Sequence, residues 1–284
     1  MHAVAENGAS WEGRIELYHA RDRGRSYLAR CRHHGPLRVQ RPFHPEGPEV
    51  CHTYLLHPPG GVVCSDRLQI HVRAAAGSHV LLTTPGAGKF YRSTGRHQAR
   101  VVQHLAVERG ATLEWLPQEN IFYDGARCEL LTRVQLSPGG RFLGWEIDCL
   151  GRPASDERFT GGRVRLRLEL WHGDEPLWLE RNCFTGGAAV MDAAWGLQGL
   201  PVTATLVCAP VPPELVPELT SALRGRIKPR HRASFAVTVL EEVLICRVLC
   251  RQSHEARRLL EAAWRVLRPA LCGRDAVPPR IWNT

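Results

Sequence analysis

The stretch GRVRLRLEL, residues 162–170, decides the fold, because apolar and charged side chains alternate along it without a break. An extended chain turns successive side chains to opposite faces, so this period of two predicts a half-buried β-strand and not a helix. Residues 172–176 (HGDEP) have the composition of a turn, and residues 177–181 are expected to return as the second strand. The segment therefore predicts an antiparallel hairpin with one face on a core.

Similar alternation extends along the chain up to about residue 210. The other expected strands are residues 14–20, 26–32, 68–73, 100–107, 129–136 and 141–149. Turn residues predict that 14–20 pair with 26–32, and that 129–136 pair with 141–149 across the sequence SPGG at 137–140. This pattern predicts a mainly β protein, with a β-helix-like or sandwich-like body of antiparallel and mixed strands. No repeat of fixed length is present, so the pattern alone does not predict a regular solenoid.

The last quarter of the chain carries helical as well as strand patterns. Leucines at helical spacing predict a helix over residues 213–226, and Ser253 is a suitable N-cap for a second helix that ends near Leu267, before Pro269. The remaining expected elements are two apolar strands, residues 233–240 and 243–249, and an extended end, residues 278–282. We therefore expect two helices in the C-terminal region, appended to the β body.

Length and composition fit one globular domain. Of the 284 residues, 44% are hydrophobic and 23% are charged, a balance that excludes a largely disordered chain. The first ten residues are expected to form a disordered leader. Residues 11–284 are expected to form a single domain, with a β body over about 11–210 and an α/β part over about 211–284.

Charge and hydropathy restrict the partners. Thirty-seven Lys and Arg residues oppose 28 Asp and Glu residues, for a net charge of +9, and nearly all the positive charge is arginine. The basic residues are spread along the chain, so we predict an acidic protein partner and not nucleic acid, although a coding sequence rich in G and C explains the arginines equally well. No apolar run reaches the roughly 18 residues of a membrane span, and residues 1–12 lack the pattern of a secretory signal. We expect a cytoplasmic protein that does not enter a membrane.

Cysteine and histidine residues form no recognisable metal motif. The ten cysteines are scattered and none forms a CxxC pair, which zinc ribbons and knuckles require. Cys246, Cys250 and His254 would align on a helix, but the first two fall in a predicted strand. Most cysteines are therefore expected to be small buried residues in a reducing compartment.

One lysine motif resembles the end of a nucleotide-binding P-loop. In TTPGAGKFY, residues 83–91, Gly88 and Lys89 are in place, but a P-loop needs glycine at Thr83 and Ser or Thr at Phe90. The flanking pattern also lacks the helix whose N-terminus would bind phosphate. A nucleotide site is therefore not predicted.

Two carboxylates alternate with apolar residues near the middle of the chain. Glu146 and Asp148 share one face of the strand predicted over residues 141–149, about 7 Å apart, and Trp145 and Ile147 lie on the other face. Such a pair can guide a divalent cation or hold arginine side chains. On this pattern alone we interpret the pair as part of a solvated strand face.

Several blocks of sequence resemble, in the same order, the UreD (also called UreH) family of urease accessory proteins. They are LLHPPGG at residues 55–61, DRL at 66–68, TTPGAGKFYRS at 83–93, LEWLPQE at 113–119, FYDGA at 122–126, FLGWE at 142–146, LGR at 150–152 and PRIW at 279–282. The single residues that carry the resemblance include His57, Pro58, Pro59, Gly60, Gly61, Lys89, Phe90, Tyr91, Arg92, Glu119, Asp124 and Trp282. The resemblance extends over residues 11–284, nearly the whole chain.

The resemblance implies a function and partners. UreD-like proteins are scaffolds and not enzymes: they bind UreF directly, reach the GTPase UreG through UreF, and dock on apo-urease as dimers of heterocomplexes to permit nickel insertion. No catalytic residue is therefore expected. Proposals for this family route nickel along an interior passage, which Asp66, Glu146, Asp148 and Glu180 are expected to line here. Oxygen ligands along a path hold nickel transiently, so neither a tight metal site nor a tightly bound cofactor is predicted.

One loop departs from the family pattern. The family has two glycines before the aspartate that corresponds to Asp66, and this chain has Cys64 and Ser65 there. If those glycines need a positive φ, the loop must be arranged differently here. The thiol is also a candidate soft ligand for nickel, although a tolerated replacement by small residues explains it equally simply.

Two other functions compete with the scaffold. The first is a β-rich hydrolase or nucleotide-binding enzyme that uses Lys89, Tyr91 and Asp124, which predicts turnover by the isolated chain. The second is a nucleic-acid binder, suggested by the net charge, which predicts binding that weakens steeply with salt. The sequence contains no nucleic-acid reader motif, so the scaffold is the preferred reading.

Overall fold

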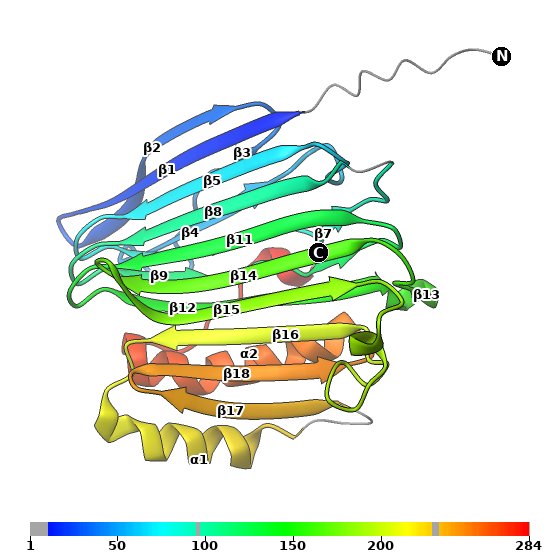
Figure 1. The fold of residues 1–284 in the computed structure, drawn as a ribbon. Coiled ribbons are helices and arrows are strands. Elements are labelled where there is room, and N and C mark those ends of the chain that lie inside the picture. Colours follow the sequence, from blue (N-terminus) through cyan, green and yellow to red (C-terminus); the bar gives the residue numbers. More distant parts are fainter. Residues whose placement is uncertain (1–10, 95–96, 229–232, 284) are drawn as a thin grey trace.

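Two β-sheets lie one behind the other in the computed structural model (Figure 1), which describes residues 11–94, 97–228 and 233–283. The predicted leader, residues 1–10, lies outside the described residues. The described residues form two α-helices, α1 (Val216–Arg226) and α2 (Ser253–Cys272), and both belong to the C-terminal region. The prediction of a mainly β protein with two C-terminal helices is confirmed.

The first sheet has seven strands in the order β15-β14-β11-β8-β5-β1-β2. These strands are β1 (Glu12–Asp22), β2 (Arg25–His34), β5 (Arg67–Ala74), β8 (Ala99–Val107), β11 (Arg127–Leu136), β14 (Arg163–His172) and β15 (Glu175–Thr185). Neighbours from β1 through β5, β8 and β11 to β14 are parallel, and an antiparallel hairpin closes each end of the sheet. We call this the seven-stranded sheet.

The second sheet has eleven strands, with the order β17-β18-β16-β12-β9-β6-β4-β3 along its main path. That path contains β3 (Arg38–Val39), β4 (Val50–Leu56), β6 (His79–Thr83), β9 (Thr112–Trp115), β12 (Arg141–Arg152), β16 (Val202–Ala209), β17 (Ser234–Leu240) and β18 (Val243–Cys250). Three short strands, β7 (Gly88–Phe90), β10 (Asn120–Phe122) and β13 (Glu157–Arg158), pair beside it. We call this the eleven-stranded sheet.

The chain passes back and forth between the two sheets, so that successive circuits stack as in a solenoid. In the seven-stranded sheet β5, β8, β11 and β14 are parallel neighbours, and in the other sheet β4, β6, β9 and β12 are. The circuits begin at residues 67, 99, 127 and 163, so they differ in length. This irregularity is the reason that no fixed repeat is visible in the sequence.

Two of the three predicted hairpins are correct and one is wrong. β1 pairs with β2, and β14 pairs with β15, as predicted. β11 and β12, however, belong to different sheets, although the turn at residues 137–140 joins them. Both edges of β11 are occupied by the parallel strands β8 and β14, so this turn carries the chain across the core instead of folding it back.

Two apolar cores flank the eleven-stranded sheet. The larger core fills the space between the sheets, and the smaller one lies between the outer face of the eleven-stranded sheet and the helices α1 and α2. β12 contributes to both: Phe142 and Leu150 enter the first core, and Trp145 and Ile147 enter the second. A strand buried on both faces contradicts our interpretation of its carboxylates as solvated.

In the C-terminal region the predicted helices and strands are present, but the predicted end of the second helix and the extended chain end are wrong. The helix predicted over residues 213–226 is present as a 3-10 turn, η3 (Pro213–Leu215), followed by α1, and both apolar strands are present as β17 and β18. α2 continues past Pro269 to Cys272 and ends at Gly273, which has φ +65°. The end expected to be extended contains a 3-10 helix, η4 (Arg280–Asn283). Among the described residues, no helix is both long and apolar enough to cross a membrane.

Candidate functional site

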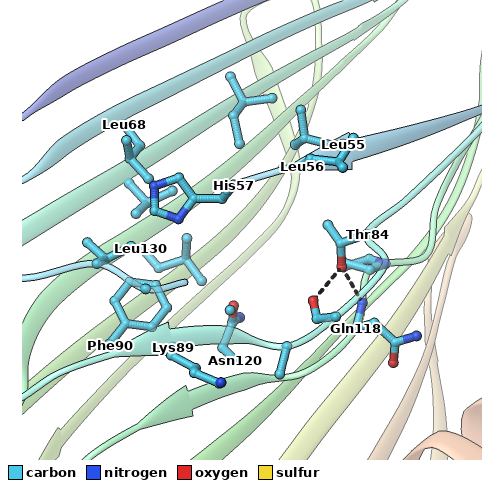
Figure 2. A pocket seen from close by; sticks show the side chains of 18 of the residues that line it. Leu55, Leu56, His57, Leu68, Thr84, Lys89, Phe90, Gln118, Asn120 and Leu130 are labelled. Carbon is cyan, nitrogen blue, oxygen red and sulfur yellow. Dashed lines mark hydrogen bonds between the residues drawn. The ribbon is translucent and has the colours of Figure 1, made fainter. Parts of the chain in front are cut away.

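A cavity of about 240 Å³ lies in the space between the two sheets. Figure 2 shows His57, which directly follows β4, and Lys89 of β7 among the side chains around it, together with Asn120. Its walls are mostly apolar, for example at Leu68 and Leu130. Its polar lining residues include Gln103, Asn120 and Glu146. The cavity therefore connects a region that holds a histidine and a lysine with a buried carboxyl group.

Glu146 and Asp148 point into this interior from β12. Alternation along the strand places them on the same side as Phe142 and Leu150, and only 6% and 4% of their surfaces are exposed. The Thr132 hydroxyl donates a hydrogen bond to Glu146, and the Asn120 amide donates one to Asp148 at 3.0 Å. The predicted pair is thus buried and held by neutral partners.

Burial controls the protonation of this pair. Loss of solvation raises the pKa of Glu146, the charge of Asp148 raises it further, and the Thr132 hydrogen bond opposes both effects. Loss of solvation also raises the pKa of Asp148, and its hydrogen bond with Asn120 offsets only part of that rise. Both pKa values therefore lie well above the ordinary carboxyl range, and the pair holds protons that a cation can displace.

Glu180 extends the acidic group toward the surface. It points inward from β15, where its carboxylate accepts hydrogen bonds from Asn182 at 2.8 Å and from Thr205 at 3.4 Å. A small second cavity is lined by Glu146, Asp148 and Glu180 together. Because Glu146 lines both cavities, the two are adjacent at this residue.

An arginine closes the outer end of this row. Glu146, Thr205 and Arg247 are cross-strand neighbours on β12, β16 and β18, so they form one line across the inner face of the eleven-stranded sheet. Arg247 donates a hydrogen bond to Glu180 at 2.7 Å, and about half of its side chain is exposed. Polar groups therefore continue from the interior cavity to an ion pair at the surface.

Asp66 does not join the other three predicted carboxylates. Its carboxylate accepts hydrogen bonds from the backbone N–H groups of Val63 at 2.9 Å and Trp11 at 3.3 Å, so it closes a loop. It does lie close enough to His57 to act on it: burial lowers the pKa of His57, and the charge of Asp66 opposes that effect. Asp66 therefore acts by its charge on His57, which lines the cavity, without lining the cavity itself.

The unusual loop before Asp66 contains backbone strain. Ser65 has φ +73°, a conformation that favours glycine, so at this position a serine adopts a backbone conformation that glycine takes without strain. The Cys64 thiol lies 3.6 Å from the hydroxyl of Thr94. Among the described residues, no group of three or more histidine, cysteine or acidic side chains is arranged to hold a metal ion.

Most residues that carry the family resemblance hold the fold together. Asp124 accepts hydrogen bonds from the backbone N–H groups of Thr160 at 2.7 Å and Gly161 at 2.8 Å, and it pairs with Arg92 at 3.0 Å. The Gly61 backbone lies against the ring of Tyr91, where a Cβ atom would come within 2.3 Å of the ring. These contacts explain why the blocks need these residue types.

Two further motif residues anchor the C-terminal region. Glu119 accepts a hydrogen bond from Ser253 at 3.1 Å, at the start of α2. Trp282 donates a hydrogen bond to Thr83 at 2.8 Å, and its ring lies 5.6 Å from that of Trp145. The motifs therefore join the β body to the helices that cover it.

The geometry does not support an enzyme that uses Lys89, Tyr91 and Asp124. Lys89 lies within strand β7 and is followed by Phe90, the last residue of that strand. In the described part of the chain it therefore does not precede a helix, as a P-loop lysine does. Burial alone would raise the pKa of Asp124, but the hydrogen bonds from Gly161 and Thr160 outweigh it and lower that pKa. Asp124 is therefore a satisfied, ionised turn residue and a poor general base.

One buried ionic cluster was not predicted from the sequence. Arg268 on α2 is fully buried and donates hydrogen bonds to Glu114 at 3.0 Å and to Glu46 at 2.7 Å. His79 contacts Glu114 at 2.8 Å, and His52 contacts Glu46 at 2.6 Å. Burial would raise the pKa of Glu114, but His79 and Arg268 outweigh it and lower that pKa to about 2. We call Arg268, Glu114, Glu46, His79 and His52 the buried ionic cluster; it ties α2 to the eleven-stranded sheet.

The fold and the interior together define a β-solenoid protein with an acid-lined interior and a helical cover. The family described as "UreD urease accessory protein" matches residues 12–283 of the chain. A urease accessory protein UreD of Dechloromonas aromatica is 45% identical over 98% of this chain and 96% of its own length. Proteins of the same name from Pseudomonas fluorescens and Azoarcus sp. are 44% and 43% identical, and cover 97% and 100% of the chain and 96% and 100% of their own lengths. The chain belongs to the UreD family of urease accessory proteins.

Proposed function

We propose that this chain is a cytoplasmic scaffold for urease maturation, which binds apo-urease together with UreF and the GTPase UreG and enables nickel insertion. Membership of the UreD family supports the role in maturation. The single structural observation that supports nickel transfer is the row of buried carboxyl groups, Glu146, Asp148 and Glu180, next to the interior cavity. The chain acts as a scaffold without catalytic residues, and the assembly is a dimer of heterocomplexes.

Nickel is the cargo of the proposed passage. The apolar walls give no ligands, so the ion is held only where carboxyl, amide and hydroxyl oxygens meet, at Glu146, Asp148 and Glu180 with Asn120 and Thr205. A hard oxygen set binds nickel more weakly than imidazole or thiolate ligands do. Weak holding at successive positions favours transfer over storage. Asp66, beside His57, serves the other end of the cavity.

Arg247 controls the outer end of the passage in this proposal. Its guanidinium neutralises Glu180 at 2.7 Å while no nickel is present. A divalent cation that reaches Glu180 competes with Arg247 for the carboxylate, and the half-exposed arginine can turn toward water. The exit therefore opens when cargo arrives and closes behind it.

The carboxyl pair makes stability depend on pH with a definite sign. Because the folded pKa values of Glu146 and Asp148 are raised, their stabilising protons are fully present below about pH 4 and are lost as the pH rises through the raised values. We expect the unfolding free energy to fall between roughly pH 5 and pH 8, and to fall less in Glu146→Gln, which stays neutral. Urea unfolding at several pH values measures both slopes. A wild-type slope equal to that of Glu146→Gln would show that Glu146 does not hold a proton in the folded protein over this pH range.

Co-expression tests the proposed function. Apo-urease is produced with UreF and UreG, with or without this chain, and active enzyme and co-purifying proteins are measured. We expect activation and a joint complex only when the chain is present. Equal activation without it would remove the maturation role, and substrate turnover by the purified chain alone would favour the enzyme alternative built on Lys89, Tyr91 and Asp124.

A further inference from the structure

The outer face of the seven-stranded sheet concentrates positive charge. Its outward residues alternate with buried ones, and the arginines among them are Arg14, Arg30, Arg32, Arg67, Arg73, Arg100, Arg127, Arg133, Arg163, Arg165, Arg167 and Arg181. We call this set the arginine face. The acidic residues that share the face or pair with its arginines are Glu12, Glu16, Glu108, Glu129 and Glu169. The face therefore has a large excess of positive charge.

No helix of the described residues covers this face. Both α1 and α2 pack on strands of the eleven-stranded sheet, whose outer side they bury with a second apolar core. The seven-stranded sheet therefore has a core on one side only (Figure 1). A sheet seven strands wide, at about 4.8 Å per strand and about nine residues of about 3.3 Å, presents on the order of 1000 Å². That area matches the roughly 800 Å² which one partner contributes to a stable protein interface.

Many of these guanidinium groups lack an acidic partner. The paired arginines are Arg14, Arg67, Arg73, Arg100 and Arg167. The other seven have no carboxylate within 4.0 Å in the part of the chain that the structure describes. Arg133 and Arg30 instead lie over the rings of Trp171 and Tyr18, at 4.3 Å and 5.5 Å. Stacking holds a guanidinium in place and leaves its N–H groups free to bind carboxylates.

Apolar side chains interrupt the charged residues of this face, which favours a protein partner over nucleic acid. Val102 and Leu131 are neighbours in one cross-strand row, and Ala106 and Trp171 lie on either side of Gln135 in another. Apolar and aromatic residues surrounded by arginine, without lysine, are typical of protein interfaces. The glutamates between the arginines would repel phosphates, whereas they can pair with basic residues of a protein.

We propose that the arginine face is the docking surface for a carboxylate-rich surface of one protein partner in the maturation complex. The proposal rests on the proposed function, because that function supplies the candidates: apo-urease, UreF and UreG. Arginine forks bind carboxylates in pairs and orient them, so the face fixes how the partner sits against the sheet.

The test reverses three charges that have no internal partner. Arg163→Glu, Arg165→Glu and Arg181→Glu are combined, since none of these side chains forms an ion pair whose loss would disturb the fold. Binding of the chain to purified apo-urease, UreF and UreG is measured separately at about 50 mM and about 300 mM salt. We expect affinity for one of the three to fall roughly tenfold or more, with a salt dependence that the variant loses.

A matched variant carries the same change elsewhere. It combines Arg251→Glu, Arg258→Glu and Arg265→Glu. These three arginines are exposed and lie just before α2 or on it, on the side of the eleven-stranded sheet. For the affected partner this variant should bind as the wild type does. The proposal is overturned if the first variant binds all three proteins as tightly as the wild type does, or if both variants lose the same amount of affinity. Neither result affects the maturation role. If the wild type binds a DNA duplex in a salt-sensitive way and only the first variant loses this binding, the partner of the arginine face is nucleic acid and not an acidic protein. If the wild type binds none of the three proteins, the proposed function is contradicted instead.

Discussion

Replacing Arg268 by leucine is expected to destabilise the protein more than any other single change considered for the buried ionic cluster. The guanidinium and the Glu114 carboxylate are both fully buried, and they bond through two oxygens at 3.0 Å. Removing the arginine leaves Glu114 and Glu46 as buried carboxylates that keep only His79 and His52 as partners from the cluster. Such a loss costs about 3–5 kcal/mol, because the remaining charge keeps its desolvation penalty. We expect a loss of that size in the unfolding free energy, measured by urea unfolding, together with lower soluble yield.

The same helix offers a control for this prediction. Arg265 is exposed on α2, so Arg265→Leu should change stability by less than about 0.5 kcal/mol. Arg268→Lys should fall between the two, since an ammonium keeps the charge and loses the paired hydrogen bonds. An Arg268→Leu protein as stable as the Arg265→Leu protein would mean that the cluster does not hold α2 to the sheet.

A fixed cation in the proposed passage is expected to stop nickel delivery. Glu146→Lys places an ammonium among Asp148, Glu180 and Asn120, where it can pair with the two remaining carboxyl groups. A nickel ion about 5 Å from that ammonium meets a repulsion of roughly 7 kcal/mol at an effective dielectric constant near 20. We expect the nickel content and activity of the urease produced to fall by about tenfold or more.

A control variant carries a similar charge substitution outside the interior. Glu175 lies exposed at the start of β15, so Glu175→Lys makes the same change of charge outside the interior. Nickel delivery should stay normal in that variant. Complex yield is measured in both variants, since loss of assembly in Glu146→Lys would indicate a folding effect, and normal nickel content would place the route of the ion elsewhere.

The alternating stretch at residues 162–170 predicted its own strand and hairpin correctly, because periodicity reports local burial directly. The same reasoning failed at residues 137–140, since a tight turn has the same composition whether it closes a hairpin or crosses to another sheet. Which of the two occurs depends on the parallel neighbours of β11, which lie far away in sequence. The stacking of circuits was hidden for a similar reason, because loops of unequal length separate equivalent strands.

In the candidate site, too, the sequence predicts what depends on neighbouring residues and does not predict contacts between distant ones. The spacing of Glu146 and Asp148 correctly placed them on one face, but their burial depends on the opposite sheet and could not be derived from the strand. Only the family resemblance pointed to the interior. Arg268 and Glu114 are 154 residues apart, so no local pattern joins them. A buried arginine in the apolar stripe of a helix was the one available signal of that cluster.

The interior nickel route is tested most sharply by the nickel content per active site of urease that is matured with the double variant Glu146→Gln/Glu180→Gln. Both changes keep side-chain size and remove a carboxyl group that can bind a passing cation, so complex yield should equal that of the wild type. The account predicts normal yield with nickel content lowered about tenfold. Normal nickel content in this double variant and in Asp66→Asn, Glu146→Gln, Asp148→Asn and Glu180→Gln would contradict it and exclude the interior route.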